Sequence, residues 1–555
     1  MPKYVRLFSL LAIVTIISLV IVACGGDDEP TPRPTATVQR TTGPVPTASA
    51  APQTPATPVV KRGGTLNFPL LADPTNLDPT NAEYFFGLTV GTHVYSSLVR
   101  FNWEEPRDKI VSDLAESWTV SGDGKSYTFK IRSGVKWPDG QPLTSADVKF
   151  SLQNQKGGRI APQYKSIVGI DTPDDTTAIL RLEQPRASML PPLAMHISPI
   201  YSQKAIEAGR TRGDLATAAP VGSGPFKLGT FTRGVSLELT ANPTYYVPGI
   251  PYLDAVKYFI IGDEGTRQSA LISGRIDALG LGATDVPQPV VDQMKKTAPN
   301  LVAMPFKPLQ TDVIAINVNK KPWDDVRVRR AAFLAIDRWT AIKVLPYEDK
   351  PAGMPVGLGS WGMTDEQIYK LPGYRQGADF TADRARAKQL LVDAGFAQGI
   401  DVTDAIVSPA NYDVQLFQYA KDQLAQIGIR VSGGTLSNAE QVARKEKGDF
   451  TLNFDSPALD FSDPDGARNT ILPGPFVTLA DAQLADLFQR QSAETDLSRR
   501  RQLVIDMQNR MFEIVSIIPV GTNGTFWMVQ PYLSSIGPPF GQWANVRWDR
   551  VWLNK

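Results

Sequence analysis

The only cysteine of the chain, Cys24, ends its one strongly apolar run. Lys3 and Arg6 precede an almost uncharged stretch over residues 7–23, which is the layout of a secretory signal with its cleavage site. Because a chain with a single cysteine forms no internal disulfide, an exported body of this sequence must be stabilised by its hydrophobic core. The sequence therefore predicts a large extracytoplasmic fold held together by apolar packing alone.

Residues 21–24 (Ile-Val-Ala-Cys) resemble a bacterial lipobox. The resemblance implies that residues 1–23 are a removed signal peptide and that Cys24 is lipidated, anchoring the chain to the extracytoplasmic face of a membrane, in the periplasm or at the cell surface. Two alternatives are a membrane-spanning anchor, for which roughly 17 apolar residues are the lower limit, and an ordinary buried thiol. Neither alternative explains why the only cysteine stands at this spacing.

Residues 24–62 are rich in proline and threonine and contain no aromatic side chain. Such a segment buries too little apolar surface to offset its ordering entropy, so we expect a disordered linker. Its span is about 35 Å as a flexible coil and about 115 Å as an extended polyproline helix. The alternative is a docking motif for a proline-binding domain.

About 530 residues remain after the signal, more than a single hydrophobic core supports, so at least two lobes are expected. Lys and Arg number 57 and Asp and Glu 56, a net charge of +1. A nucleic-acid partner requires a concentrated basic face, and this balance predicts none.

Local patterns predict both strands and helices. Alternating apolar residues predict half-buried strands over residues 127–131 and 235–239. Helical periodicity and stop signals predict helices over 381–394, ended by Gly395, over 416–427, ended by Gly428 and followed by a strand at 429–431, and over 503–515. The chain is therefore expected to be of the α/β class.

From residue 63 to the C-terminus the chain resembles the solute-binding proteins of ABC importers, family 5, which bind oligopeptides, dipeptides or nickel. The most specific block is residues 114–152, LAESWTVSGDGKSYTFKIRSGVKWPDGQPLTSADVKFSL. Further blocks follow in the family order at residues 63–66 (GGTL), 76–79 (NLDP), 222–226 (GSGPF), 242–246 (NPTYY), 273–277 (SGRID) and 326–331 (VRVRRA).

This resemblance implies a two-lobed periplasmic-binding-protein-like fold of the class II "Venus flytrap" type, with an extra subdomain in the first lobe. It implies a first lobe of residues 63–96, 219–305 and 519–555, an extra subdomain of 97–218 and a second lobe of 306–518. The implied protein is a monomeric receptor without a cofactor. It closes on a solute and delivers it to the permease and ATPase subunits of the importer.

The resemblance also implies a ligand contact. Asp460 falls where peptide-binding members place an aspartate that pairs with the α-ammonium of the ligand, although it can also bond a nearby backbone N–H within a turn sequence. Pro457 stands where the family often has a tryptophan, and the loop at residues 408–413 lacks the arginine with which dipeptide binders hold the ligand carboxylate. A longer peptide or a sugar is therefore as easily accommodated as a dipeptide.

Aromatic side chains offer flat surfaces for peptide side chains or sugar rings. The candidates are Tyr84, Phe86, Trp361, Phe461 and Trp527. For each of them a packing role is the alternative. Trp118, Trp137 and Trp323 lie inside framework blocks and are assigned to the core.

Other functional classes find little support. Only two histidines are present, neither in a metal-ligand spacing, and no Gly-x-Ser-x-Gly motif occurs, so enzymatic activity is not expected. A surface adhesin or chaperone of the same fold stays open because fold alone does not determine function. Among ligands the sequence favours a peptide, then an oligosaccharide, then a metal chelate.

Overall fold

The structure is a computed structural model. It describes residues 60–80, 85–102, 109–155, 161–209, 220–280, 285–306, 309–354, 361–459, 461, 463–537 and 546–555. Cys24, the linker as far as residue 59, Tyr84 and Asp460 lie outside the described residues. Within the described part, no helix is both long and apolar enough to cross a membrane.

Strands from the two ends of the body form the first group of elements, which we call the first lobe. A four-stranded sheet has the order β1-β10-β9-β8, with β1 parallel to β10 and the other pairs antiparallel. An antiparallel sheet has the order β11-β19-β12, and β20 pairs with β21. The elements are β1 (Thr65–Leu70), α1 (Phe85–Val94), β8 (Phe226–Thr232), β9 (Ser236–Ala241), β10 (Ala255–Ile260), α6 (Glu264–Ile272), β11 (Ala278–Leu279), α7 (Gln288–Thr297), β12 (Val302–Phe306), β19 (Thr525–Val529), β20 (Leu533–Ser534) and β21 (Trp552–Leu553).

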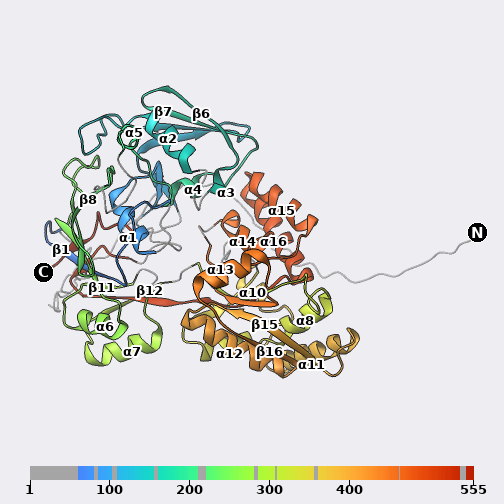
Figure 1. Ribbon diagram of the computed structural model, residues 1–555. Coiled ribbons are helices and arrows are strands. Elements are labelled where there is room, and N and C mark those ends of the chain that lie inside the picture. The colour runs from blue at the N-terminus through green and yellow to red at the C-terminus, as the bar shows by residue number, and fades with distance from the viewer. Residues whose placement is uncertain are drawn as a thin grey trace, which may run out of the picture. The chain divides into compact units, whose positions relative to one another are not determined.

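A second antiparallel sheet, β4-β5-β7-β6, belongs to the group that we call the subdomain. Helix α2 covers β6 and β7, as the upper part of Figure 1 shows. The elements are β2 (Val99–Phe101), β3 (Ile110–Ser112), β4 (Ala115–Val120), β5 (Ser126–Ile131), α2 (Ser145–Asn154), α3 (Ala161–Tyr164), β6 (Ile167–Asp174), β7 (Thr177–Leu182), α4 (Leu190–Ala194) and α5 (Gln203–Glu207).

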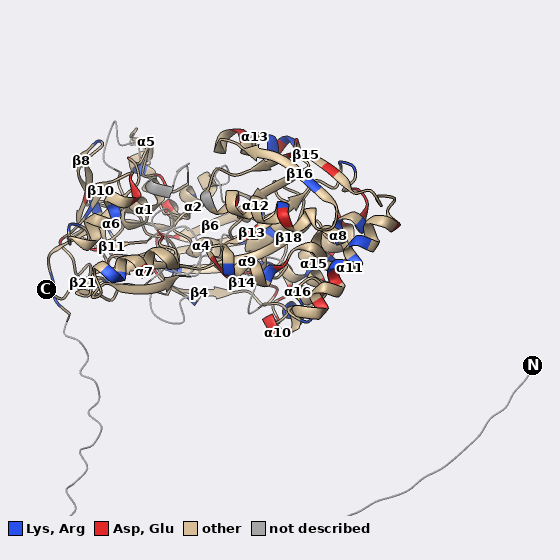
Figure 2. Cartoon of the chain, turned by 90° about the horizontal axis from the view of Figure 1, so that it is seen from below, with Lys and Arg blue, Asp and Glu red and all other residues tan. Residues whose placement is uncertain are grey.

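The third group, the second lobe, is built on a six-stranded mixed sheet of order β14-β18-β13-β17-β15-β16. Basic and acidic residues are interspersed on the helices around it, including α8, α11 and α15 (Figure 2). The elements are β13 (Thr311–Ile316), α8 (Val326–Ala335), α9 (Arg338–Val344), β14 (Glu348–Pro351), α10 (Asp365–Ile368), α11 (Gly377–Asp393), β15 (Ile400–Val407), α12 (Asn411–Ala425), β16 (Ile429–Thr435), α13 (Asn438–Lys447), β17 (Leu452–Asp455), the 3-10 helix η2 (Pro464–Ala467), α14 (Arg468–Ile471), α15 (Ala482–Ala493), α16 (Leu497–Ile514) and β18 (Ile517–Asn523).

Two segments connect the first lobe to the second. The chain passes from β12 to β13 through residues 307–310, and it returns from β18 to β19 through Gly524 alone. The two passages run side by side, because the N–H of Asn523 donates to the carbonyl of Gln310 over 3.2 Å. Neighbouring crossings of this kind are where a two-lobed protein bends.

The buried apolar residues form separate cores. One lies entirely within residues 313–520, and another within residues 88–200 together with Phe461. Two further cores combine residues 66–306 with residues 527–553. This grouping supports the expected lobes and subdomain, whose boundaries stay a prediction.

Several predicted elements are confirmed in type but differ in extent. β5, β9, α11, α12, β16 and α16 lie where strands and helices were expected. Thr381 was wrong as the start of its helix: α11 begins at Gly377, and the Thr381 hydroxyl donates to the Gly377 carbonyl from inside the helix. Val235, the predicted first residue of its strand, lies in the turn before β9, because its N–H donates to the carbonyl of Thr232. Its side chain is exposed.

Of the framework tryptophans, Trp137 and Trp323 are fully buried, as expected. Trp118 is only partly buried and packs against the edge of the subdomain core.

Candidate ligand-binding site

The expected ligand segment, residues 450–466, connects the second lobe to the subdomain. Phe461 is buried in the subdomain core. Immediately after it the chain makes a tight turn, in which Asp463 caps η2 by accepting the N–H of Asp465. Gly466 lies directly against the backbone of Phe461, where an added Cβ would be 2.2 Å from the carbonyl oxygen. The segment that carries Asp460 therefore lies at the contact between the two parts.

A buried ion pair fixes this turn to the second lobe. The Arg500 guanidinium donates to both oxygens of Asp463, over 2.8 and 2.6 Å. The same guanidinium lies 4.7 Å from the ring centre of Trp361. Burial nevertheless raises the pKa of Asp463, and the Arg500 charge opposes that shift. Trp361 therefore packs against Arg500, and its contact with a ligand stays a prediction.

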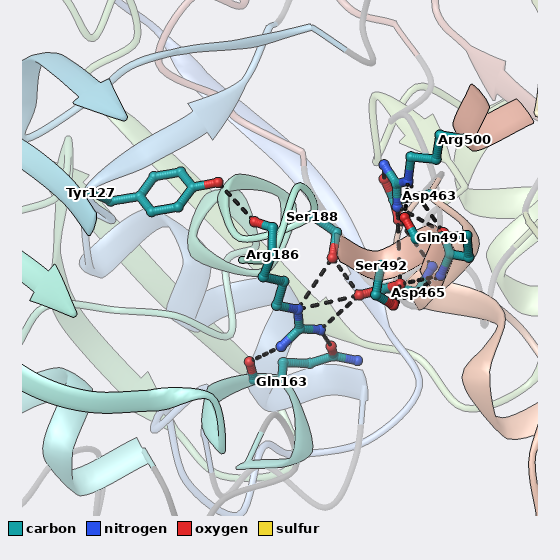
Figure 3. A network of polar contacts seen from close by, with 9 residues as sticks. All are labelled: Tyr127, Gln163, Arg186, Ser188, Asp463, Asp465, Gln491, Ser492 and Arg500. Carbon is teal, nitrogen blue, oxygen red and sulfur yellow. Dashed lines mark hydrogen bonds and ion pairs between the residues drawn. The ribbon is translucent and has the colours of Figure 1, made fainter. Parts of the chain in front are cut away.

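A second set of polar contacts joins the subdomain to the second lobe (Figure 3). Arg186 donates to the Asp465 carboxylate from two nitrogens, over 3.2 and 3.1 Å, and Ser188 donates to the same oxygen. From the other side, Gln491 and Ser492 donate to the second oxygen of Asp465. Although burial alone would raise it, the pKa of Asp465 is lowered, because Arg186 and these donors stabilise its charge. We call Arg186, Ser188, Asp465, Gln491 and Ser492 the interlobe clamp.

Of the remaining aromatic candidates, only Trp527 has a side chain that the structure describes. Trp527 is fully buried in the first-lobe core between Phe306 and Trp548, and an added Cβ at Gly280 would be 2.5 Å from its ring. We assign Trp527 to packing. Phe86 lies in α1, but its side chain is not among those the structure describes.

A cluster of carboxyl groups that was not expected from the sequence lies beside the crossing segments. We call Asp312, Glu348 and Asp413 the acidic cluster. Asp312 and Asp413 are each only 1% exposed. The Ser456 hydroxyl lies within hydrogen-bond distance of both, 2.6 Å from Asp413.

Glu348 completes the acidic cluster from β14. Its carboxyl contacts that of Asp312, and both of its oxygens are shielded from solvent. The carboxyl covers the backbone of Gly521, where an added Cβ would be 1.8 Å from an oxygen of Glu348. The glycine in β18 therefore makes room for the acid in β14.

Burial governs the electrostatics of this cluster. Burial and the charges of Asp455 and Asp312 raise the pKa of Asp413 to about 8. Burial, followed by the charge of Asp312, raises the pKa of Glu348 well above its usual value. Burial likewise raises the pKa of Asp312. Burial therefore favours the protonated form of each acid of the cluster over its ionised form.

One sequence signal pointed to this cluster. Asp312 is a single acid within an otherwise apolar strand, TDVIAI, all of whose residues are buried. Asp413 and Glu348 gave no such signal, because each stands in a polar surrounding in the sequence.

A cavity of about 30 Å³ lies between the subdomain and the first lobe, lined in part by Arg100 and His196 of the former and Arg547 of the latter. Such a volume has room for about one or two water molecules. This cavity is too small for a peptide or a sugar.

The comparison with known families decides the class of protein. Residues 109–475 match the family model described as bacterial extracellular solute-binding proteins, family 5. The chain belongs to this family. Solute-binding proteins of family 5 serve ABC importers outside the cytoplasm, and the family is one of binding proteins and not of enzymes.

Individual relatives agree with the family. The glutathione-binding protein GsiB of Escherichia coli K12 is 28% identical over 379 residues, which cover 67% of this chain and 69% of GsiB. The solved binding protein AgaA of A. tumefaciens R10, in complex with agropinic acid, is 26% identical with a TM-score of 0.74, and the match covers 89% of this chain and 99% of AgaA.

Two structures of lower identity share the fold. DppA of Helicobacter pylori, in complex with the peptide STSA, has 24% identity and a TM-score of 0.73, over 89% of this chain and 99% of DppA. AppA of Bacillus subtilis, in complex with a nonapeptide, has 20% identity and a TM-score of 0.72, over 90% of this chain and 100% of AppA. The family 5 protein described here therefore has the expected class II periplasmic-binding-protein fold.

Proposed function

We propose that this family 5 protein is the membrane-anchored receptor of an ABC importer and that it captures a peptide between its two lobes. One observation carries the proposal. The chain matches nearly the full length of AppA and DppA, both solved with peptides, while its relative GsiB binds glutathione, itself a small peptide. AgaA, solved with agropinic acid, is the reason to test other small solutes beside peptides.

Closure on the ligand is the mechanism that this fold supports. A solute that contacts both lobes only when they meet favours the closed state. The shift in the equilibrium equals the difference between the binding free energies of the solute for the closed and the open state. The interlobe clamp supports this mechanism, because its ion pair joins residues far apart in sequence, Arg186 of the subdomain and Asp465 of the second lobe. The permease and ATPase subunits would then receive the closed form.

The ligand class is tested by native mass spectrometry of the freshly purified protein, followed by thermal unfolding with peptides, oligosaccharides and metal chelates. A ligand at about 100 times its Kd stabilises the folded state by about 2.7 kcal/mol. We expect a co-purifying peptide and stabilisation by peptides. A bound sugar or chelate, with no response to any peptide, would contradict the proposal.

Asp460 is the residue that we propose for the α-ammonium of the peptide. In a closed site, removal of this partner by Asp460→Ala should weaken peptide binding by about 2–5 kcal/mol, measured by calorimetry. Asp449→Ala, at an exposed carboxylate of the same lobe, is the control and should bind as the unchanged protein does. A loss of less than tenfold in affinity for the Asp460 variant would remove Asp460 from the site.

Membrane anchoring is proposed to depend on Cys24. The variant Cys24→Ser should leave the protein in the soluble extracytoplasmic fraction, because lipidation needs the thiol. Cell fractionation measures this, and Ser49→Cys in the Cys24→Ser background is the control for a cysteine elsewhere in the linker. Retention of the Cys24→Ser protein in the membrane fraction would argue for the spanning anchor.

A further inference from the structure

We propose that the acidic cluster is a second subsite of the receptor, which accepts a cationic group of the captured solute, an ammonium or a guanidinium. This inference rests on the proposed function, because it assigns part of the same solute to Asp312, Glu348 and Asp413. It adds a preference for cationic solutes that membership in family 5 does not supply.

The first argument is charge balance. Among the described residues, no lysine, arginine or histidine forms an ion pair with Asp312, Glu348 or Asp413. Lys445, a base of the same lobe, lies 2.5 Å from Asp455 and neutralises that neighbouring carboxylate. A buried carboxyl cluster is costly unless it is paired, so the three acids either keep protons or receive a cation from outside.

The second argument is the supply of hydrogen atoms for hydrogen bonds. The Ser456 hydroxyl has one hydrogen but contacts both Asp312 and Asp413, so it donates to only one of them at a time. Apart from a proton shared with Asp312, no N–H or O–H group of the described residues donates to either oxygen of Glu348. Asp312 and Asp413 each have one further side-chain donor, so the oxygens without a donor from the rest of the described chain are those of Glu348. An ammonium would bring three donors to them.

The third argument is independent of the acids. Asn523 is only 4% exposed and lies opposite Glu348 in the pairing of β14 with β18. Its side chain is hydrogen-bonded to Asp312, yet its carbonyl oxygen has no hydrogen-bond partner among the described residues. A buried amide oxygen without a donor is unusual in a folded protein, and here it belongs to a side chain that contacts the cluster.

The surroundings of the cluster also suit a cation. Tyr347 and Tyr412 precede Glu348 and Asp413 in the chain, are half-buried, and place their ring centres 5.8 Å apart at an angle of 69°. Aromatic faces attract ammonium and guanidinium groups. The tyrosines lie at the crossing segments, because the carbonyl of Tyr347 accepts the N–H of Gly524.

A metal ion is not favoured as the occupant. In the described part of the chain, no group of three or more histidine, cysteine, aspartate or glutamate side chains is arranged to hold a metal ion. An organic cation does not need convergent ligands at metal distances and is bound by dispersed oxygens and aromatic rings.

Cation binding at this subsite should release protons and become tighter as the pH rises. The titratable groups that face the cluster are Asp312 of β13, Glu348 and Asp349 of β14, Tyr347 before β14, Tyr412 and Asp413 of α12, and Asp455 of β17 with its partner Lys445 of α13. Burial raises the pKa of the cluster acids, so protons compete with the cation at neutral pH and less so above about pH 8.

Calorimetry with matched peptides tests the proposal. The probes are Ala-Lys-Ala and Ala-norleucine-Ala, each with a free and with an acetylated N-terminus, together with putrescine and methylguanidine. We expect the lysine peptide to bind at least tenfold more tightly than the norleucine peptide, and to release protons when buffers of different ionisation enthalpy are compared. The acetylated pair shows whether the cation in question is the side chain or the N-terminus.

Two variants and one control locate the preference. Glu348→Gln and Asp413→Asn keep the size of each side chain and should each reduce the preference for lysine over norleucine at least tenfold. Glu366→Gln is the control, since Glu366 makes an exposed pair with Lys370 in the same lobe, and it should keep the preference. The midpoint of thermal unfolding, measured for all three, confirms that each variant is folded.

The outcomes separate this inference from the proposed function. Binding of both peptides with equal affinity, or a preference that survives in both variants, overturns the cationic subsite and leaves a peptide receptor. Binding of putrescine or methylguanidine alone, lost in Glu348→Gln, supports the subsite and overturns the peptide. If none of the probes binds, the inference is overturned together with the peptide proposal.

Discussion

At the scale of single residues, the buried carboxyl groups of the second lobe include two contrasting sets. Asp463 and Asp465 each meet an arginine, Arg500 and Arg186 respectively. The carboxyls of the acidic cluster meet no base among the described residues, and burial raises their pKa. Asp463 and Asp465 are thus neutralised within the protein, whereas we propose that the acidic cluster is neutralised by a cationic group of the ligand.

Asp413 gives a prediction about pH. Its pKa is raised to about 8 in the folded protein, well above its value in an unfolded chain, so the folded state binds an additional proton between about pH 4 and pH 8. Stability therefore falls as the pH rises through this interval, by up to about 1.4 kcal/mol for each unit between the two pKa values.

Asp413→Asn should flatten this pH dependence, because asparagine does not titrate. Urea unfolding at pH 5 and pH 8 measures it, and Asp401→Asn, at an exposed pair with Arg430, is the control that should keep the slope of the unchanged protein. If the Asp413→Asn protein lost as much unfolding free energy between pH 5 and pH 8 as the unchanged protein does, Asp413 would be ionised at neutral pH.

At the scale of elements, local patterns predicted where helices end better than where they begin. Gly395 and Gly428 end α11 and α12 with φ angles of 91° and 93°, a conformation that glycine adopts easily. The predicted starts were late for all three helices, since α11, α12 and α16 begin at Gly377, Asn411 and Leu497. The first turns, GADF, NYDV and LSRR, mix polar and apolar residues, so the apolar period that reveals a helix only becomes visible after them.

The C-terminal glycine of α11 gives a prediction about stability. Gly395→Ala should destabilise the protein by about 1–2 kcal/mol, the cost of a left-handed conformation for an L-residue, because no atom lies within 4 Å of the added Cβ. Gly122→Ala is a matched control, since it also has open space but no positive φ, and should cost less. If both substitutions reduced the free energy of unfolding equally, the positive φ of Gly395 would not be the cause of the loss.

At the scale of the whole molecule, the contact between subdomain and second lobe is built from residues distant in sequence. Arg186 and Asp465 are separated by 279 positions, and the N–H of Ala187 donates to the carbonyl of Ser492 beside them. Phe461 joins the subdomain core at the same contact. This contact therefore has both a polar and an apolar component.

The interlobe clamp predicts a mutational effect on closure. Arg186→Ala leaves Asp465 buried without its cation, which should favour the open form and weaken ligand affinity about tenfold, equivalent to about 1.4 kcal/mol. Fluorescence energy transfer between one label on each lobe measures the open fraction. Arg181→Ala, at an exposed pair with Asp171 in the subdomain, is the control. An unchanged open fraction in Arg186→Ala would mean that the clamp does not act in closure.

The sequence by itself determined the class of this protein. Ordered motifs, apolar periodicity and stop signals are local properties, so they predicted the family, the α/β fold and six of the helices and strands, namely β5, β9, β16, α11, α12 and α16. They did not reveal that Trp361 packs against Arg500 or that Trp527 is buried in the first-lobe core.

Only the tertiary structure decided which charges meet. Asp312, Glu348 and Asp413 come from three elements separated by dozens of residues, and their proximity arises when β13, β14 and α12 pack together. The energy of a carboxyl group depends on its burial and on its neighbours in space, neither of which is encoded in its immediate sequence. The motifs therefore identify a solute receptor. The packing of its second lobe brings together the acids that we propose to bind a cationic group of the solute.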